Sequence, residues 1–413
     1  MTSSLSDRGR RLVVDAPMAE YIHAHFERLD DLWDPIGNPG GYIGLCVAEN
    51  KLVWDLLEPK LTAPRQVPPS AVEYDEMIGG HSFRSRLAEF LGRRLYGRDI
   101  DPEHLAVLGG AGSVLELLFY AIADPGDGVL VPTPSYAGFW ADLETRNELT
   151  IVPVHTSPAD DFRLRMDQLE VAYRSAGRPV RALLYTTPSN PLGRVSSRPE
   201  LEEVLGWAEG KDMHVVFDEL FAMSVHGDAS FVSAGTLRPT LGERMHLVWA
   251  VSKDLAASGL RCGVLVTENE AVIRAVDGLA YWACVSGDTQ RLVEEMLADT
   301  DWVDAFVGEN RRRLGNSYAQ VTAALDAAGI PYLPAQAGFF FLVDFRPFLP
   351  QVNWAAEDAL WRRILEEAKV NLTPGSSCRI EEPGFMRLCF AGVPHEAAVA
   401  GVRRIERVLA SDA

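Results

Sequence analysis

The chain has 413 residues, of which 47% are hydrophobic and 23% charged, and its formal net charge is −19. This length and composition are typical of a compact globular protein with two closely packed domains. Nucleic acid is disfavoured as a partner, because a polyphosphate would meet an acidic field that no run of lysine or arginine offsets. No stretch approaches the ~20 apolar residues of a membrane span, and the N-terminal residues lack a signal-peptide core, so we expect a soluble cytoplasmic protein.

The cysteines and histidines form no pattern of a disulfide framework or a metal site. Five cysteines, an odd number without a Cys-x-x-Cys pair, favour reduced thiols. The nine histidines include no ligand-spaced set such as His-Glu-x-x-His. We therefore expect no metal.

Short apolar runs alternate with longer amphipathic ones through most of the chain, a pattern typical of strand–helix units around a mostly parallel sheet. Several runs are rich in Val, Leu and Ile on both faces, as a sheet covered by helices on both sides requires. The expected strands are 128–132, 150–154, 182–186, 214–218, 246–251 and 263–266. The expected helices are 112–123, 166–175, 199–209 and 270–278.

The pattern changes after an amphipathic stretch at residues 301–328. Elements of a second, smaller α+β domain are expected there: a strand at 338–344, a helix at 355–368, a strand at 386–390 and a last helix from His395. We expect the proline-bearing residues 1–65 to be irregular and to wrap onto this domain. The predicted fold class is therefore α/β, with a large domain at 66–304 and a small domain formed by 1–65 and 305–413.

A glycine-rich turn, Leu108-Gly109-Gly110-Ala111-Gly112-Ser113, leads directly into an expected helix. Backbone N–H groups of Gly110, Ala111 and Gly112 could bind a phosphate there, because a helix N-terminus attracts anions. The turn alone is more often an ordinary strand–helix connection. A dinucleotide fingerprint does not fit, because the spacing is not Gly-x-Gly-x-x-Gly.

Two further groups follow expected strands, at the edge where open α/β sheets bind ligands. Tyr136 could stack on a planar ring, although a single tyrosine more often packs in the core. Asn190 lies in Thr187-Pro188-Ser189-Asn190-Pro191-Leu192-Gly193, between two prolines that restrict its backbone and aim its amide. The alternative is an Asn-capped turn, but the seven-residue segment is more informative than one Asn.

Charged residues near later strand ends complete the candidate site. Asp218 ends the strand 214–218, Ser252 and Lys253 follow the strand 246–251, and Arg261 lies a few positions beyond them. Near the C-terminus Arg387 interrupts an apolar run, and a buried arginine needs an anion, either a substrate carboxylate or an acid of the protein itself. Taken singly, each has an ordinary explanation; an isolated lysine, for example, is mostly a surface residue.

Together and in this order, these groups meet the demands of pyridoxal 5′-phosphate (PLP) chemistry. A lysine must form the Schiff base, a carboxylate must keep the pyridine nitrogen protonated, and an aromatic side chain must stack on the ring. A helix N-terminus and an arginine must hold the phosphate, and a second arginine the substrate carboxylate. We therefore predict a PLP-dependent enzyme that acts on an α-amino acid.

With these residues the chain resembles the fold-type I PLP enzymes, the aspartate aminotransferase superfamily, and within it the 1-aminocyclopropane-1-carboxylate (ACC) synthases. Three segments point to the ACC-synthase-like branch: Ala48-Glu49-Asn50, Ser252-Lys253-Asp254-Leu255 and Pro374-Gly375-Ser376-Ser377-Cys378. The resemblance implies an aspartate-aminotransferase-like fold, whose large domain holds a mostly parallel seven-stranded sheet. It also implies a homodimer whose active sites are completed across the interface.

The resemblance implies a role for each candidate residue. Lys253 is the Schiff-base lysine and proton shuttle, Asp218 pairs with the pyridinium, and Tyr136 stacks on the ring. Asn190 holds the ring oxygen O3′ and faces the substrate. The implied phosphate ligands are Arg261, Ser252 and the backbone of Gly110, Ala111 and Gly112.

The substrate contacts and three departures also follow from the resemblance. Arg387 binds the α-carboxylate and Glu49 lines the substrate pocket. The tyrosine that normally donates to O3′ is Phe221, a phosphate-binding serine is Ala250, and the tyrosine that reaches across from the neighbouring subunit is Met77. Each lost neutral hydrogen bond costs roughly 0.5–1.5 kcal/mol, so cofactor binding should persist in a less polar site.

Several reactions stay open at this point. The first hypothesis is γ-elimination or γ-substitution of S-adenosylmethionine, with cyclisation of the C4 fragment or its capture by a second substrate, including C–C bond formation or annulation. An aminotransferase or a PLP-dependent oxidase would use the same residues. A regulator of this fold is disfavoured, because the first 65 residues are too short, too acidic and too proline-interrupted for a helix-turn-helix module.

Overall fold

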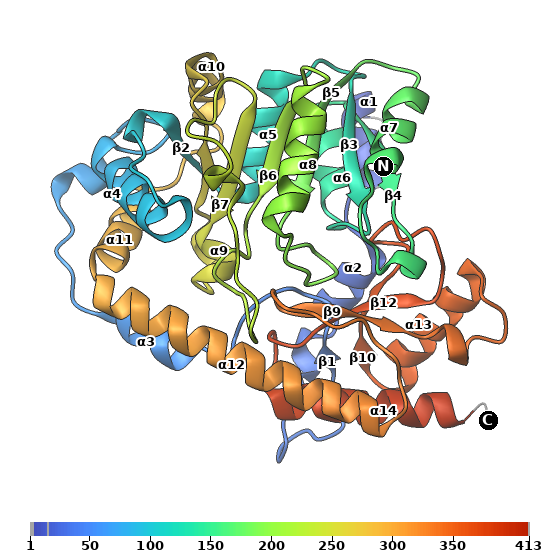
Figure 1. Ribbon diagram of the computed structural model, residues 1–413. Helices are drawn as coiled ribbons and strands as arrows, with labels where there is room; N and C mark the ends of the chain where they lie inside the picture. The colour runs from blue at the N-terminus through green and yellow to red at the C-terminus, as the bar shows by residue number, and fades with distance from the viewer. Residues whose placement is uncertain (1–3, 15, 412–413) are drawn as a thin grey trace.

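The computed structural model describes residues 4–14 and 16–411 (Figure 1). Its largest feature is a seven-stranded sheet in the order β2-β8-β7-β6-β5-β3-β4. The five strands from β7 to β4 in this order are parallel to one another, whereas β8 is antiparallel to both β2 and β7. This mostly parallel sheet confirms the expected fold class. The strands are β2 Leu105–Leu108, β3 Gly128–Thr133, β4 Thr150–His155, β5 Val180–Thr186, β6 His214–Asp218, β7 Met245–Ala250 and β8 Gly263–Val266.

Helices cover both faces of the sheet, which explains why its strands are apolar on both sides. In β6, Val216 packs in a core cluster with α5 and α10, while Val215 and Phe217 pack in a second cluster with α7 and α8. Alternate residues of a strand point to opposite faces, so a two-sided core needs this continuous apolar run. The helices are α5 Ala111–Ile122, α7 Met166–Ser175, α8 Arg198–Glu209 and α10 Glu270–Ala280.

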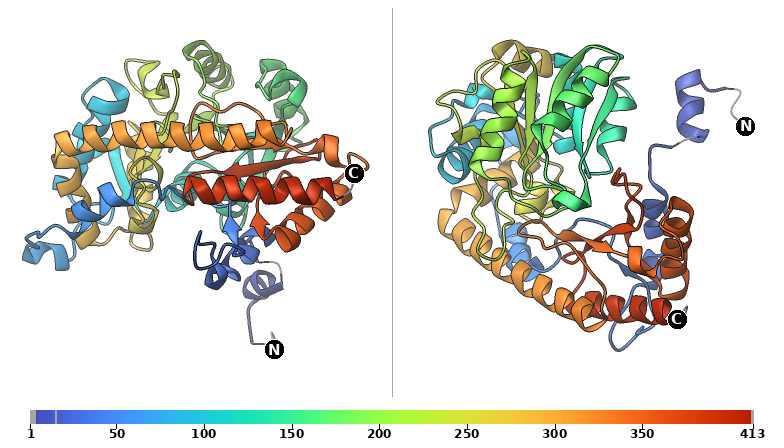
Figure 2. Two further views of the ribbon diagram at one scale, coloured as in Figure 1. Left: turned by 90° about the horizontal axis from the view of Figure 1, so that it is seen from below. Right: turned by 45° about the vertical axis from the view of Figure 1, so that its right-hand side comes forward.

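The second part of the chain holds two small sheets, β11-β12-β9 and β1-β10. The three-stranded sheet is antiparallel and the two-stranded sheet parallel. A separate core cluster fills this part, and the long α12 runs beside α14 in both views of Figure 2. The elements are β1 Ile43–Gly44, β9 Phe340–Asp344, β10 Val370–Asn371, β11 Thr373–Pro374, β12 Phe385–Cys389, α12 Thr300–Ala327, α13 Trp354–Glu367 and α14 His395–Ala410.

The N-terminal residues contact this second part. Ile43 pairs with Val370, and Tyr21 is buried in the same core cluster. The expectation of an irregular segment is wrong, however, because residues 4–65 contain the helices α1 Asp7–Val14, α2 Glu20–Phe26 and α3 Trp54–Thr62. α12 is continuous across the expected boundary between residues 304 and 305, so that division stays a prediction.

Several elements were not expected from the sequence. β2 has four buried residues, as many as β8, but it was not among the expected strands. The helices α4 His81–Leu91, α6 Phe139–Glu144 and α11 Gly287–Ala298 were also not predicted. Within the described ranges, the helices fall short of the length and apolarity that crossing a bilayer requires.

Candidate active site

The carboxyl ends of β3, β5, β6 and β7 meet at one edge of the large sheet, because these strands are parallel. Asp218 is the last residue of β6, and the chain leaves β3 and β5 toward Tyr136 and Asn190. After β7 the chain forms the short helix α9, Val251–Asp254, which carries Lys253. The strand ends therefore place the predicted groups at a common edge.

The Lys253 amine donates a hydrogen bond to the backbone oxygen of Ala48, which lies 2.7 Å from Nζ. Burial, and then the positive charge of Arg387, lower the pKa of Lys253 to about 8. A larger fraction of this amine is therefore neutral near neutral pH than of an exposed lysine, as a nucleophile requires. Glu49 acts in the opposite direction on this pKa, which shows that its carboxylate is near the amine.

Asp218 is a buried carboxylate at the end of β6. Its Oδ1 accepts a hydrogen bond from Leu220 N at 3.1 Å. Burial nevertheless raises the pKa of Asp218 to about 7, against the effects of this hydrogen bond and of Lys253. A buried carboxylate of this kind is stabilised by a cationic donor, such as a protonated pyridine nitrogen.

Two further buried acids hold the local backbone, and neither was among the predicted site residues. Glu219 accepts hydrogen bonds from Ser233 Oγ at 2.7 Å and Ala234 N at 2.6 Å. Asp254 accepts from Met223 N, Ser224 Oγ and Trp249 Nε1 at 3.1, 2.7 and 2.9 Å. The available signal was position, because each acid directly follows a candidate residue, Asp218 or Lys253.

Arg387 and Asn190 lie 197 positions apart in sequence but are bonded to each other. Arg387 Nη1 donates to Asn190 Oδ1 at 3.0 Å, and Nη2 donates to Cys46 O at 2.7 Å and Thr373 Oγ1 at 3.0 Å. This bond orients the side chain of Asn190: Oδ1 accepts from Arg387, and the amide nitrogen, which is a donor, can donate to a ligand.

The remaining guanidinium nitrogen of Arg387, Nε, is buried and has no hydrogen-bond partner. The alternative of an internal ion pair is therefore not observed, because among the described residues no acid bonds to this arginine. A buried guanidinium with an unused donor is suited to bind an anion that enters the site.

The glycine turn and Arg261 form a cradle at the N-terminus of α5. Arg261 Nη2 lies 3.3 Å from Gly109 O. Gly110 has a φ of 101°, and a Cβ there would lie 2.4 Å from Arg261 Nη2. A Cβ at Gly263 would lie 2.7 Å from Ala111 N. Glycine at both positions therefore lets the guanidinium and the first N–H groups of α5 approach one another, as phosphate binding requires.

The other predicted residues lie around these groups with varying exposure. Tyr136 is 39% exposed and packs edge-on against Phe139, with ring centroids 5.3 Å apart. Ser252 is buried in α9, and Gly112 lies in the first turn of α5. The Glu49 carboxylate is 3.7 Å from Lys51 Nζ and is half-exposed.

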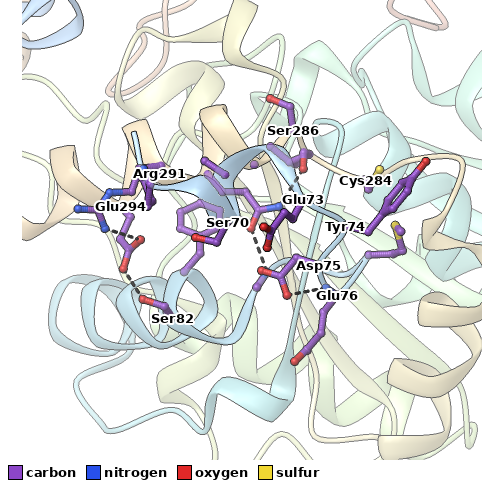
Figure 3. A pocket seen from close by; sticks show the side chains of 18 residues that line it. Ser70, Glu73, Tyr74, Asp75, Glu76, Ser82, Cys284, Ser286, Arg291 and Glu294 are labelled. Carbon is purple, nitrogen blue, oxygen red and sulfur yellow. Dashed lines mark hydrogen bonds and ion pairs between the residues drawn. The ribbon is translucent and has the colours of Figure 1, made fainter. Parts of the chain in front are cut away.

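The positions that depart from the family pattern are apolar in the structure as well. Phe221 is buried between Phe339 and Phe340, with centroid distances of 5.2 and 5.1 Å, and Ala250 is fully buried. No hydroxyl replaces the missing tyrosine at these positions. Met77 lines a pocket of about 340 Å³, whose acidic side chains and Cys284 are labelled in Figure 3.

The described residues offer no cluster of side chains that could bind a metal ion. Among the described residues, no group of three or more His, Cys, Asp and Glu side chains could hold a metal ion. All five cysteines are free thiols, and four of them are buried.

Comparisons with known proteins support one family. The model of the Aminotransferase class I and II family matches residues 42–405. The chain is 37% identical to 1-aminocyclopropane-1-carboxylate synthase 3 of Oryza sativa subsp. japonica, over 91% of this chain and 89% of that protein. It is 33% identical to 1-aminocyclopropane-1-carboxylate synthase 6 of Arabidopsis thaliana, over 90% of this chain and 79% of that protein. The fold is similar to that of aspartate aminotransferase from Thermus thermophilus with maleate, with a TM-score of 0.80, 24% identity and coverage of 98% and 99%.

The residues in the site fit the cofactor of this family. The cradle at Gly110 and Arg261 suits a phosphate, Asp218 suits a pyridinium, and Lys253 offers a partly neutral amine. The unpartnered Nε of Arg387 suits a carboxylate. The chain therefore belongs to the aminotransferase class I and II family, close to the ACC synthases, and is a PLP-dependent enzyme with the aspartate-aminotransferase fold.

Proposed function

We propose that this enzyme uses S-adenosylmethionine as its amino-acid substrate and removes the γ-substituent. The observation that carries the proposal is the contact between Lys253 Nζ and Ala48 O at 2.7 Å. This contact supports the proposal because it joins Lys253 to the segment Ala48-Glu49-Asn50, which points to the ACC-synthase-like branch. Asn50 is held there by a 2.7 Å hydrogen bond from its Nδ2 to Asn310 Oδ1.

The proposed roles follow from the geometry of the site. Bound PLP supplies an electron sink for the Cα of the amino acid, and Asp218 keeps its ring nitrogen protonated. Asn190 donates its free amide nitrogen to the ring oxygen, and Tyr136 stacks on the ring face. Arg261 holds the phosphate together with Ser252 and the N–H groups of Gly110, Ala111 and Gly112.

Arg387 and Lys253 act on the substrate itself. The Arg387 guanidinium binds the α-carboxylate through its unused donor, and this contact fixes the Cα–H bond relative to the lysine. Lys253 Nζ then accepts the Cα proton. The bond between Cγ and the sulfonium sulfur breaks, and sulfur leaves with the electron pair as the neutral thioether methylthioadenosine. The C4 fragment closes a ring between Cα and Cγ or bonds to a second substrate.

The apolar wall formed by Phe221, Phe339 and Phe340 supports capture by a second substrate. These side chains are buried together in one core cluster, at a place where the family pattern has a phenol. Phe340 also lies beneath Arg387, whose Cζ is 5.4 Å from the ring centroid. A drier site protects a reactive fragment from hydrolysis, so substitution and annulation belong to this proposal.

The test is product analysis of the holoenzyme with S-adenosylmethionine, alone and with candidate acceptors. We expect release of methylthioadenosine, measured by mass spectrometry, and its loss in the Lys253→Ala variant. ACC in the acceptor-free reaction identifies ring closure, and a new adduct identifies substitution. If the wild-type holoenzyme releases no methylthioadenosine, the proposal is wrong.

Transamination is the second candidate, because the structural neighbours include aspartate aminotransferases and the same side chains serve both reactions. Formation of pyridoxamine phosphate on addition of an amino acid, reversed by a 2-oxo acid, would select it. Oxygen uptake under the same conditions would instead select a PLP-dependent oxidase.

A homodimer is also part of the proposal. Tyr74, Tyr281 and Trp282 are 93%, 63% and 73% exposed, an unusual set of large side chains for free surface. The segment of Tyr281 and Trp282 borders the phosphate cradle, since Gly109 N donates to Ala283 O at 2.7 Å, and Tyr74 lines a pocket with the nearby Cys284. A second copy of the chain would cover them beside the active site. Light scattering of the holoenzyme should give twice the chain mass of 45.4 kDa, and the Trp282→Ala variant should shift the equilibrium toward the monomer.

We also propose that the protein works in the cytoplasm. The support is chemical: all five cysteines are free thiols, which a reducing compartment preserves.

A further inference from the structure

An open cavity of about 1430 Å³ lies between α1, α6 and the loop that follows β11. α1 has no buried residue, and its Arg8 forms an ion pair with Glu148 at 3.0 Å. The other walls of the cavity come from Ala137 and Trp140 near the start of α6 and from Ser377 and Arg379 in the loop. None of the PLP-binding or substrate-binding residues assigned above lines it.

Arg379 has an unusual position in this cavity. Its φ is 55°, a left-handed conformation that costs a non-glycine residue energy and often marks a functional position. Its guanidinium lies over the Trp140 ring, with Cζ 4.7 Å from the centroid. A guanidinium stacked on a ring uses its face for that contact and keeps its N–H donors free at the edge.

Two arginines of the cavity have no acidic partner among the described residues to balance their charge. Arg379 and Arg11 both line it, and neither has a side-chain hydrogen bond or ion pair within the described ranges. The acids of the cavity, in contrast, are all engaged. Their partners are Asp7–Arg10, Glu116–Arg146, Glu144–Ile151 N and Glu148–Arg8.

Two arginines without an acidic partner are unusual in a chain with a net charge of −19, because an arginine in so acidic a protein ordinarily pairs with a nearby carboxylate. The aromatic surface beside it is also open, since Tyr120 lines the same cavity and is 62% exposed. A ligand that satisfies both features carries an oxyanion for the guanidinium and a planar apolar part for the aromatic side chains.

We infer that Arg379, stacked on Trp140, forms a binding subsite for a small planar molecule that carries a carboxylate or a phosphate group. A backbone hydrogen bond connects the subsite to the active site. Ser135 N donates to Cys378 O at 3.0 Å and joins the loop that carries Tyr136 to the loop that carries Arg379. Cys378 is buried near Arg387. The same two loops thus contact both the substrate region and the new subsite.

Direct binding to the PLP-loaded enzyme tests the subsite without reference to the reaction. The probes are benzoate and phenyl phosphate, which share a ring and differ in the oxyanion, and neutral benzyl alcohol. We expect saturable calorimetric binding of at least one anion and not of the alcohol. Loss of a charge-assisted hydrogen bond should weaken that binding about tenfold or more in Arg379→Gln. Trp140→Leu should weaken it less. The preferred anion distinguishes a carboxylate from a phosphate ligand.

Arg403→Gln is the matched control, because Arg403 is an exposed arginine of α14 outside the cavity lining. It should bind the probes as the wild type does. The spectral response of Arg379→Gln to the amino-acid substrate should also be unchanged, which separates this inference from the proposed reaction. Equal affinity of the wild type and Arg379→Gln for both anions, or no preference of the wild type for the anions over benzyl alcohol, would overturn the inference.

Discussion

Replacing Arg387 by lysine tests the substrate-carboxylate site most directly. The substitution keeps the positive charge but removes the planar fork. In the wild type, Nη1 and Nη2 are bonded to Asn190, Cys46 and Thr373, whereas the buried Nε is the nitrogen without any hydrogen-bond partner among the described residues. A lysine presents a single nitrogen, which cannot hold Asn190 and a carboxylate in the same geometry.

The expected magnitude follows from the hydrogen bonds lost. A hydrogen bond to a charged group contributes about 1.5–3 kcal/mol. If the variant loses one such bond to the α-carboxylate, the dissociation constant of the amino acid should rise about 10- to 150-fold. The phosphate cradle at Arg261 is untouched, so cofactor content should stay at the wild-type level.

The assay is a spectrophotometric titration of the holoenzyme with the amino-acid substrate and with its carboxamide. The wild type should bind the acid much more tightly than the amide, and the Arg387→Lys variant should lose most of this preference. Arg404→Lys is the matched control, because Arg404 bonds to backbone oxygens of Gly41, Ala368 and Pro39. A dissociation constant within threefold of the wild type in Arg387→Lys would refute the carboxylate assignment.

Three further predictions concern the acids and the apolar wall. Asp254→Ala leaves the donors of Trp249, Ser224 and Met223 without their acceptor, so the free energy of unfolding should fall by about 3 kcal/mol or more in denaturant titrations; an unchanged midpoint would contradict this. In the cofactor-free enzyme the pKa of Asp218 is raised from 3.8 to about 7, so the native state binds this proton more tightly than the unfolded state does. Stability should therefore fall as pH rises from about 4 to about 7, and the fall in the thermal unfolding midpoint should be smaller in Asp218→Asn. If the midpoints of the variant and the wild type change in parallel with pH, this prediction is wrong. Phe221→Tyr restores a donor to the ring oxygen and should lower the pKa of the cofactor–lysine Schiff base by about 0.4–1 unit in a spectrophotometric titration, whereas no shift would show that the phenol does not reach the ring.

Much of the large sheet could be predicted from the sequence, because its strands are buried on both faces. Runs such as His214–Asp218 and Gly263–Val266 are continuous, apolar and bounded by polar residues, and the structure has these two strands with the same limits. A parallel sheet also gathers its carboxyl ends at one edge, so residues just after those strands were candidates for a site. The fold class and the cofactor followed from this local information.

The contacts that make these residues a site depend on the tertiary structure. Arg387 meets Asn190, and Lys253 meets Ala48, across about 200 residues of chain, and no local pattern encodes such pairs. The same holds for the free Nε of Arg387, because a sequence cannot show which donors the fold leaves unpaired. For the acids Glu219 and Asp254 the sequence offered only their position beside candidate residues, since burial among specific donors is what distinguishes them from surface carboxylates. Local periodicity thus determined most strands of the large sheet, and packing at the strand ends decided the chemistry.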